Sequence, residues 1–256
     1  MLRPNRVALI YNGGMYRLPA IVLCITLAGI TAFKVSAENA RPLQIAVAAN
    51  FRAVAEQLAA EFEEATGINS RVSSASTGVL SAQLRRGAPF DLLLAADLAR
   101  PEALARDGFS HGAAQCYAQG SLVLLGAQSL DEAQNSVGRR IAIANPRSAP
   151  YGKAAMGLLD SDRFPGISRK NIVMGTNVQQ ALLFFNSGAA DFALVARSLS
   201  PDKGVPVPRE WHAPIDQYAV ISASTAQTDS ANRFLSFLLG DDAIRTLTAF
   251  GYRPCS

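Results

Sequence analysis

Short apolar runs alternate with stretches of helical periodicity from Leu43 to the end of the chain, and this alternation constrains the fold most. Leu43 to Ala48 is typical of a buried strand, whereas Phe51 to Thr66 repeats apolar side chains at helical spacing and stops at Gly67. Strands that alternate with helices favour sheets that are mostly parallel and flanked by helices. At 256 residues and 49% hydrophobic, the chain suits one large α/β unit or two lobes.

The predicted elements fall into two groups. The first holds three strands and two helices: Leu43 to Ala48, around Arg71 to Ser73, Asp91 to Ala96, Phe51 to Thr66, and about Val79 to Arg86. The second holds four strands and two helices: Leu122 to Leu125, Ile141 to Ala144, Ile172 to Val173, Phe192 to Val195, about Gly152 to Leu159, and about Val178 to Phe185. An irregular, proline-rich segment precedes one more strand and two helices: Pro201 to Pro214, Tyr218 to Ile221, about Ser230 to Leu239, and Asp242 to Phe250. We expect the chain to cross between lobes near 117–122 and near 212–218, and the last helices to return to the first lobe.

The first 37 residues are typical of an export signal. They carry four basic side chains and no acidic one, an apolar run from Leu18 to Phe33, and small residues at Val35 and Ala37 that suit cleavage after Ala37. The alternative, a membrane anchor, would need about 20 apolar residues. Cleavage would leave 20 basic and 20 acidic side chains of the 24 and 20 in the whole chain, so we expect a periplasmic protein without the charge to bind nucleic acid.

Two cysteines, Cys116 and Cys255, follow the predicted leader, which itself contains Cys24. An even pair in an oxidising compartment favours a disulfide, and two separate buried thiols are the alternative. Two cysteines so far apart in the sequence do not indicate a zinc or iron–sulfur site.

Sequence motifs for enzymatic chemistry are missing. The chain has no G-x-S-x-G, H-E-x-x-H or G-x-G-x-x-G motif, and its two histidines, His111 and His212, stand apart from any cysteine or carboxylate cluster. Asp91 and Asp97 flank a predicted strand, where solvation or helix capping is the expected role. We therefore expect a binding protein that is not an enzyme and needs no cofactor.

Four short polar stretches each follow a predicted strand and open a helix: Ala49-Asn50-Phe51, Ser76-Thr77-Gly78, Pro150-Tyr151-Gly152 and Asn177-Val178-Gln179. A helix start offers unpaired backbone N–H groups and the positive end of the helix dipole, which suit an anion. Ordinary helix capping is the alternative for each stretch. Two stretches in each half could meet in a cleft between two lobes.

The chain resembles the periplasmic molybdate-binding proteins, the solute receptors of molybdate ABC importers. The resemblance rests on these segments: Ile45 to Phe51, Ser73 to Gly78, Arg86 to Asp97, Ile143 to Pro146, Ala149 to Gly152, and Ala249 to Tyr252. It implies the two-lobed, type II periplasmic binding fold, with a hinge of two crossings. Lobe 1 would comprise residues 38–120 and 215–256, and lobe 2 residues 121–214.

The resemblance also implies the ligand set and the partners. Backbone amides of Asn50, Thr77, Tyr151 and Val178, together with the Thr77 hydroxyl, would hold molybdate or tungstate, and the expected partner is the membrane permease of an ABC importer. We expect a monomer. Ala49 departs from relatives that often carry a hydroxyl at this position or the next. The resemblance places both Cys116 and Cys255 on the first lobe.

The residue chemistry fits a fully deprotonated oxyanion, because none of the four stretches contains Asp or Glu to accept a proton from the ligand. Arg147 and Lys153 flank one stretch and are expected to be solvated. Two alternatives stay open: a receptor for sulfate or another oxyanion, and an enzyme of the same fold, such as a dehydratase.

Overall fold

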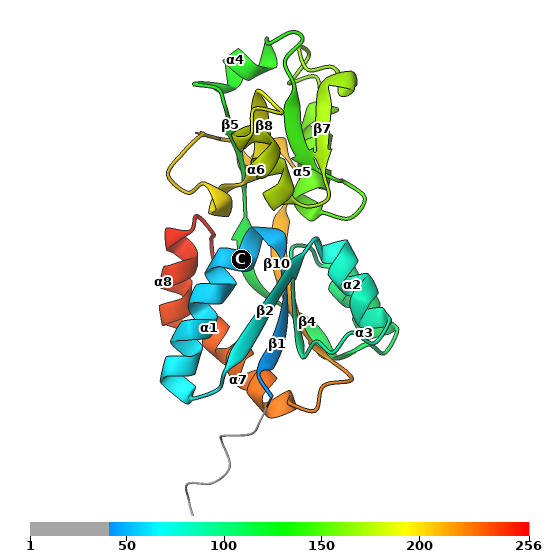
Figure 1. Ribbon diagram of the computed structural model, residues 1–256, viewed down its shortest axis with the longest axis vertical. Coiled ribbons are helices and arrows are strands. Elements are labelled where there is room, and N and C mark those ends of the chain that lie inside the picture. The colour runs from blue at the N-terminus through cyan, green and yellow to red at the C-terminus, as the bar shows by residue number, and fades with distance from the viewer. Residues whose placement is uncertain (1–40, 256) are drawn as a thin grey trace, which may run out of the picture. The chain divides into compact units, whose positions relative to one another are not determined.

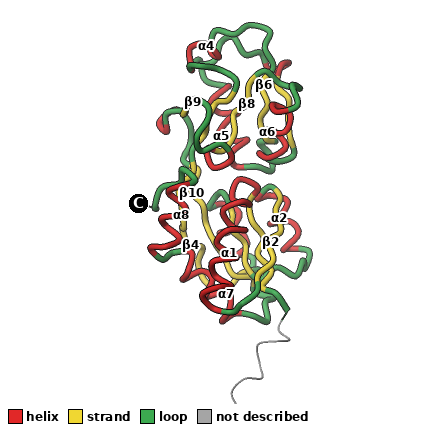
Figure 2. Tube along the Cα trace, turned by 60° about the vertical axis from the view of Figure 1, so that its left-hand side comes forward, coloured by secondary structure: helices red, strands yellow, loops and turns green. Residues whose placement is uncertain are grey.

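The computed structural model describes residues 41–255, so the predicted leader and its cleavage site lie outside the described residues. The described part contains two five-stranded sheets, each flanked by helices (Figures 1 and 2). None of the helices within residues 41–255 has the length and apolar character to cross a membrane.

The first sheet has the strand order β2-β1-β3-β10-β4. Its strands are β1 (Leu43–Ala48), β2 (Ser70–Ala75), β3 (Leu92–Ala95), β4 (Ser110–Gly120) and β10 (Ile215–Ser222). β1 runs parallel to β2 and β3, and β10 runs antiparallel to β3 and β4. The helices of this lobe are α1 (Arg52–Thr66), α2 (Thr77–Arg85), α3 (Ala99–Arg106), α7 (Thr228–Leu238) and α8 (Asp241–Ala249).

Both faces of the first sheet are covered, which explains the apolar runs in its central strands. Ile45 and Val47 of β1 belong to the buried cluster beneath α1, α7 and α8, whereas Ala46 between them belongs to the cluster beneath α2 and α3. Successive side chains of a strand point to opposite faces, so a strand covered on both sides needs apolar residues at every position. Figure 1 shows α1 and α8 on one side of this sheet and α2 and α3 on the other.

The second sheet has the order β7-β6-β8-β5-β9. Its strands are β5 (Leu122–Leu125), β6 (Ile141–Ala144), β7 (Ile172–Gly175), β8 (Phe192–Ala196) and β9 (Val205–Pro206). β6 runs parallel to β7 and β8, and β5 runs antiparallel to β8 and β9. The helices of this lobe are α4 (Leu130–Gln134), α5 (Pro150–Leu159) and α6 (Val178–Asn186), with short 3-10 turns η2 (Arg169–Asn171), η3 (Arg197–Leu199) and η4 (Arg209–Trp211).

The chain passes from the first sheet to the second between Gly120 and Leu122, and it returns between Pro206 and Ile215. Residues 41–120 and 215–255 therefore carry the first sheet and residues 121–214 the second, and we call these two parts the first and the second lobe. The first lobe is completed by the chain end, where Gln119 and Arg253 exchange two backbone hydrogen bonds of 2.7 and 3.0 Å.

Both sheets are mostly parallel, as predicted: one strand of each, β10 in the first and β5 in the second, runs antiparallel to the other four. Two elements of the first lobe differ from the prediction. The helix α3 and the long strand β4 were not predicted. β4 lies at the edge of the sheet beside β10 and is largely exposed over its first half, so its sequence lacks the apolar run that marks a covered strand.

Asp91 also differs from the expectation that it is solvated or caps a helix. Its carboxylate is fully buried and accepts two hydrogen bonds from the Arg41 guanidinium, at 2.8 and 2.7 Å, and one from the Gln44 N–H at 2.8 Å. The Thr225 hydroxyl donates a further bond of 2.5 Å, and the Gln227 amide one of 3.3 Å. Asp91 thus ties together the segment before β1, the start of β3 and the turn before α7.

Burial alone would raise the pKa of Asp91, but the hydrogen bonds from Arg41, Thr225 and the Gln44 N–H together hold it below its usual value. A carboxyl with a lowered folded-state pKa contributes stability above its unfolded pKa of about 3.9, and this contribution is lost as pH falls through the folded value.

We therefore expect Asp91→Asn to lower the free energy of unfolding at pH 7 by about 2–4 kcal/mol, because a neutral amide cannot accept all of the hydrogen bonds that the buried carboxylate accepts from Arg41, Gln44 and Thr225. Its stability should also fall less steeply than that of the wild type below about pH 4. Urea unfolding between pH 3 and pH 7 measures both effects. Asp107→Asn, which breaks the half-exposed ion pair with Arg85, is the control and should cost less than about 1 kcal/mol. Equal losses from the two variants would contradict this role of Asp91.

A disulfide joins Cys116 of β4 to Cys255, with the two Cα atoms 6.1 Å apart. The bond closes a loop with a sequence separation of 139 residues. In the loop-entropy model such a crosslink stabilises the fold by about 5 kcal/mol. It holds the chain end beside the crossing from β4 to β5.

Candidate functional site

A small cavity of about 10 Å³ lies where the two lobes meet. Its lining comes from both lobes: Ala48, Ala49, Asn50, Ser76, Thr77, Ala149, Pro150, Tyr151, Asn177 and Val178. Apart from Pro150 and Asn177, each of these residues is at most 5% exposed. Pockets for drug-sized organic ligands measure about 300–1,000 Å³. The cavity in this conformation therefore suits a compact group of a few atoms.

Four helices begin at this cavity. The turn η1 (Ala49–Phe51) leads into α1, and α2, α5 and α6 begin at Thr77, Pro150 and Val178. The first turn of a helix leaves backbone N–H groups without intrahelical partners and carries about half a positive charge. The four stretches singled out from the sequence therefore converge on one space.

The four predicted ligand residues, Asn50, Thr77, Tyr151 and Val178, all line this one cavity. Two belong to the first lobe and two to the second, so only the juxtaposed lobes bring them together. Their placement follows from the strand ends: parallel strands of each sheet finish at the same edge, and the helices that follow them start there.

The Asn50 side chain is engaged with protein groups. Its Nδ2 donates to Gln217 Oε1 at 2.9 Å and to the Tyr252 hydroxyl at 2.8 Å. Its backbone carbonyl accepts a 2.8 Å bond from the Ser198 hydroxyl, which belongs to the second lobe. The Tyr252 hydroxyl lies 3.0 Å from the Ser198 hydroxyl. Asn50 therefore links the first turn of its helix to the returning strand β10, the chain end and the opposite lobe, leaving its backbone N–H as the group that a ligand could use.

Ser76 and Thr77 present two different hydroxyls. The Thr77 hydroxyl accepts a 3.0 Å bond from the Ala96 N–H, so part of its capacity is used to join α2 to the end of β3. The Ser76 hydroxyl, in a residue only 4% exposed, has no hydrogen-bond partner among the described residues. A buried polar group without a partner costs free energy. Ser76 is therefore a ligand candidate that the sequence prediction, which chose Thr77, did not include.

The Tyr151 side chain extends from the cavity lining toward the crossing between lobes. Its hydroxyl lies 1.9 Å from the place that a Cβ on Gly120 would occupy, so only glycine fits at that position. Burial, with the neighbouring Tyr252 and Tyr117 hydroxyls, raises the pKa of Tyr151 well above its usual value. Burial likewise raises the pKa of Tyr252 to about 12. Both phenols are neutral at pH 7, and Tyr151 can offer the cavity its backbone N–H.

No charged side chain lines the cavity in the part of the chain from 41 to 255. The same residues hold no cluster of three or more His, Cys, Asp or Glu side chains that could bind a metal ion. Asp97 instead caps α3, where its Oδ1 accepts a 3.0 Å bond from the Arg100 N–H. Arg147 and Lys153 are exposed, as expected. The positive potential of the site therefore comes from helix ends and N–H groups.

Three residues that position the site were not singled out from the sequence: Ser198, Gln217 and Tyr252. Tyr252 lies in the closing segment on which the family resemblance partly rests, but it received no role. Each is separated from Asn50 by more than 140 positions, so no local motif could have joined them.

A family model described as "Bacterial extracellular solute-binding protein" matches residues 43–253. The chain is 34% identical over 230 residues to the molybdate-binding protein ModA of Azotobacter vinelandii, covering 84% of this chain and 91% of the relative. It is 32% identical over 217 residues to ModA of Rhodobacter capsulatus, covering 81% and 86%.

The solved structure of an Azotobacter vinelandii periplasmic molybdate-binding protein superposes with a TM-score of 0.77 at 34% identity, covering 84% of this chain and 100% of that one. These likenesses confirm the predicted resemblance and the two-lobed α/β fold class. The chain belongs to the family of bacterial extracellular solute-binding proteins that includes these molybdate-binding relatives.

Proposed function

We propose that this protein is a periplasmic receptor that binds molybdate, and also tungstate, between its two lobes and delivers it to the permease of an ABC importer. The observation that carries the proposal is the convergence of four helix N-termini on one cavity whose lining has no charged side chain. Such helix ends are suited to anions. The molybdate-binding relatives, at 34% and 32% identity, supply the identity of the anion.

The cavity chemistry supports an anion that carries no proton at neutral pH. A protonated oxyanion, such as hydrogen phosphate, would need an acceptor for its O–H, and no carboxylate lines the cavity within residues 41–255. Molybdate, tungstate and sulfate are fully deprotonated tetrahedral dianions that can only accept hydrogen bonds. A lining of N–H and O–H donors therefore matches them.

The donors that we assign to the ligand are the backbone N–H groups of Asn50, Thr77, Tyr151 and Val178 and the hydroxyls of Thr77 and Ser76. Each hydrogen bond to a charged group contributes about 1.5–3 kcal/mol, so several together could hold a dianion without a countercharge. Ala49 contributes no hydroxyl, and the unpartnered Ser76 hydroxyl could replace one.

We propose no catalytic role and no cofactor. An enzyme of this fold would need an acid or base that titrates near neutral pH, but Tyr151, the titratable residue of the lining, is held neutral by its raised pKa. A monomer suffices, because both halves of the cavity come from one chain. A sulfate receptor is the runner-up, since sulfate has the same charge and shape and differs in size.

Calorimetric titration of the purified protein with molybdate, tungstate, sulfate and phosphate tests the proposal. We expect molybdate and tungstate to bind with dissociation constants at least about 100-fold lower than that of phosphate, because phosphate would bury an unaccepted proton. Sulfate binding tighter than molybdate would favour the runner-up, and no heat with any of the four anions would refute an oxyanion receptor.

We expect Ser76→Ala to weaken molybdate binding about 10- to 100-fold while leaving the melting temperature of the free protein unchanged or raised, because the hydroxyl has no protein partner to lose. Ser74→Ala is the matched control, since its buried hydroxyl is likewise unpartnered but does not line the cavity. Equal affinities of the two variants for molybdate would remove Ser76 from the ligand set.

Val178→Pro deletes one amide donor with little change of backbone. Proline is favoured at the first position of a helix, and Asn177 before it is extended, with φ −148° and ψ 176°, as a residue preceding proline prefers. We expect molybdate binding to weaken about 10- to 100-fold, whereas Val178→Ala, which keeps the N–H, should change it less than about threefold. Calorimetry measures both affinities, and circular dichroism checks that the fold is kept. Equal effects would contradict the amide assignment.

A further inference from the structure

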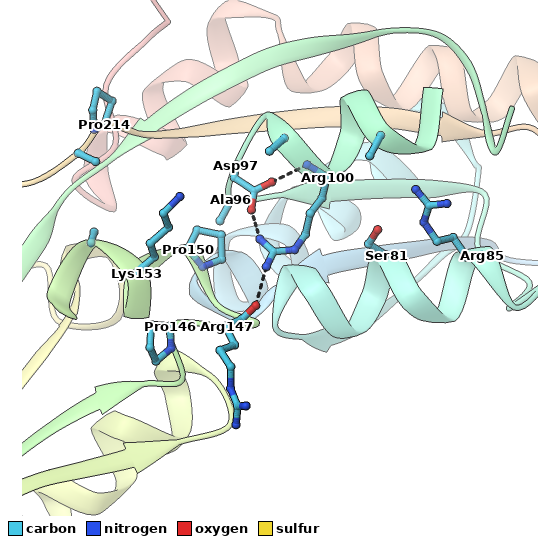
Figure 3. A pocket seen from close by; sticks show the side chains of 14 residues that line it. Ser81, Arg85, Ala96, Asp97, Arg100, Pro146, Arg147, Pro150, Lys153 and Pro214 are labelled. Carbon is cyan, nitrogen blue, oxygen red and sulfur yellow. Dashed lines mark hydrogen bonds and ion pairs between the residues drawn. The ribbon is translucent and has the colours of Figure 1, made fainter. Parts of the chain in front are cut away.

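Beside the ligand cavity, two groups of the first lobe donate hydrogen bonds to two backbone carbonyls of the second lobe. The Gly78 N–H donates to Ser148 O at 2.9 Å, and Arg100 Nη2 donates to Arg147 O at 3.0 Å. Figure 3 shows the Arg100 guanidinium between Asp97 and the Arg147 carbonyl, while the Arg147 side chain extends away from it. Neither carbonyl belongs to the cavity lining, so these contacts join the lobes without touching the ligand.

Asp97 orients the Arg100 side chain for this contact. It forms an ion pair with Arg100 Nη1 and also caps the helix that carries Arg100. The ion pair fixes the direction of the guanidinium and neutralises its charge. Arg100 therefore acts as a tie between lobes and does not serve as a countercharge for the anion.

The opposite lobe leaves little room for a side chain at Gly78. A Cβ at this position would lie 2.9 Å from Ser148 O, 3.1 Å from Ser148 Cα and 3.1 Å from Arg100 Nε. Two of these three atoms belong to backbone, which cannot turn aside as a flexible side chain can. A larger residue would force the lobes apart at this point.

The Arg147 and Ser148 carbonyls, which accept these bonds, lie in a hydrogen-bonded turn that leads directly into α5. The Ala149 N–H donates to Asn145 O at 2.9 Å, and the Arg147 N–H donates to Asn145 Oδ1 at 3.0 Å. Pro150 and Tyr151, the first residues of α5, follow immediately and line the ligand cavity. The hydrogen bonds to this turn therefore also fix the start of α5, one of the four helix starts at the cavity, against the opposite lobe.

We propose that Gly78 and Arg100 form a latch, defined by their bonds to the Ser148 and Arg147 carbonyls, that keeps the lobes closed and sets how slowly the bound anion leaves. The proposal rests on the proposed function as an oxyanion receptor. The cavity lining is mostly buried and comes from both lobes, so release of the anion requires the lobes to separate and the latch bonds to break. Gly78 and Arg100 are positioning residues in this scheme.

The test compares latch variants with matched controls in the full chain. Gly78→Ala and Arg100→Ala break the latch. Gly157→Ala is the control for the first, because a Cβ there meets nothing within 4 Å. Arg85→Ala is the control for the second. Arg85 lines the same surface pocket as Arg100 and Arg147 but pairs with Asp107 in its own lobe.

Stopped-flow measurement of molybdate association and dissociation gives the first readout. We expect dissociation to be about tenfold faster in Arg100→Ala and at least about tenfold faster in Gly78→Ala, with association changed less than about threefold. Both controls should match the wild type. A loss that falls on association and disappears at high salt would mean that Arg100 attracts the anion by charge, which would overturn the latch.

Hydrogen–deuterium exchange of the ligand-free protein gives a second readout that needs no anion. Segments 76–79 and 145–149 should exchange faster in both latch variants than in the wild type and the controls. If no anion binds the wild type, the proposed function fails while this readout still judges the latch. Unchanged exchange and unchanged dissociation in both latch variants would overturn it.

Discussion

Four positive helix ends meet at one cavity of about 10 Å³, and much of the structure follows from that arrangement. Each end carries about half a positive charge, and their mutual repulsion opposes closure of the lobes. No side-chain carboxylate lies in the described lining to relieve it. A bound dianion supplies the missing negative charge, so closure and ligand binding are coupled through this electrostatic constraint.

The protein holds these helix ends in place with groups that add no charge of their own. Asn50, Ser198, Gln217 and Tyr252 form a network of neutral hydrogen bonds that spans both lobes and the returning strand. Burial keeps Tyr252 protonated by raising its pKa to about 12. Ion pairs are placed outside the cavity lining, as in the pair of the buried Asp91 with the half-exposed Arg41 and the pair of Asp97 with Arg100. The site thus stays neutral while the surroundings are firmly fixed.

The first lobe gains rigidity from contacts between distant segments. Asp91 joins three of them, and the disulfide from Cys116 to Cys255 anchors the chain end beside the crossing at Gly120. Tyr252 precedes that anchored end by three residues and reaches the Asn50 turn. The crosslink therefore stabilises the fold and also restrains a residue that positions the ligand site.

The sequence by itself determined the covered strands, the helices that follow them and the polar stretches at the helix starts, because each depends on periodicity or capping over a few residues. The family resemblance singled out Asn50, Thr77, Tyr151 and Val178 from these stretches as one set, and all four line the same cavity. The edge strand β4 was not predicted, since an exposed edge imposes no apolar pattern. Only the tertiary structure decided that Asp91 is buried, that the Ser76 hydroxyl lacks a partner and that Gly78 touches the opposite lobe. These properties arise from contacts between segments far apart in the chain, which local spacing does not encode.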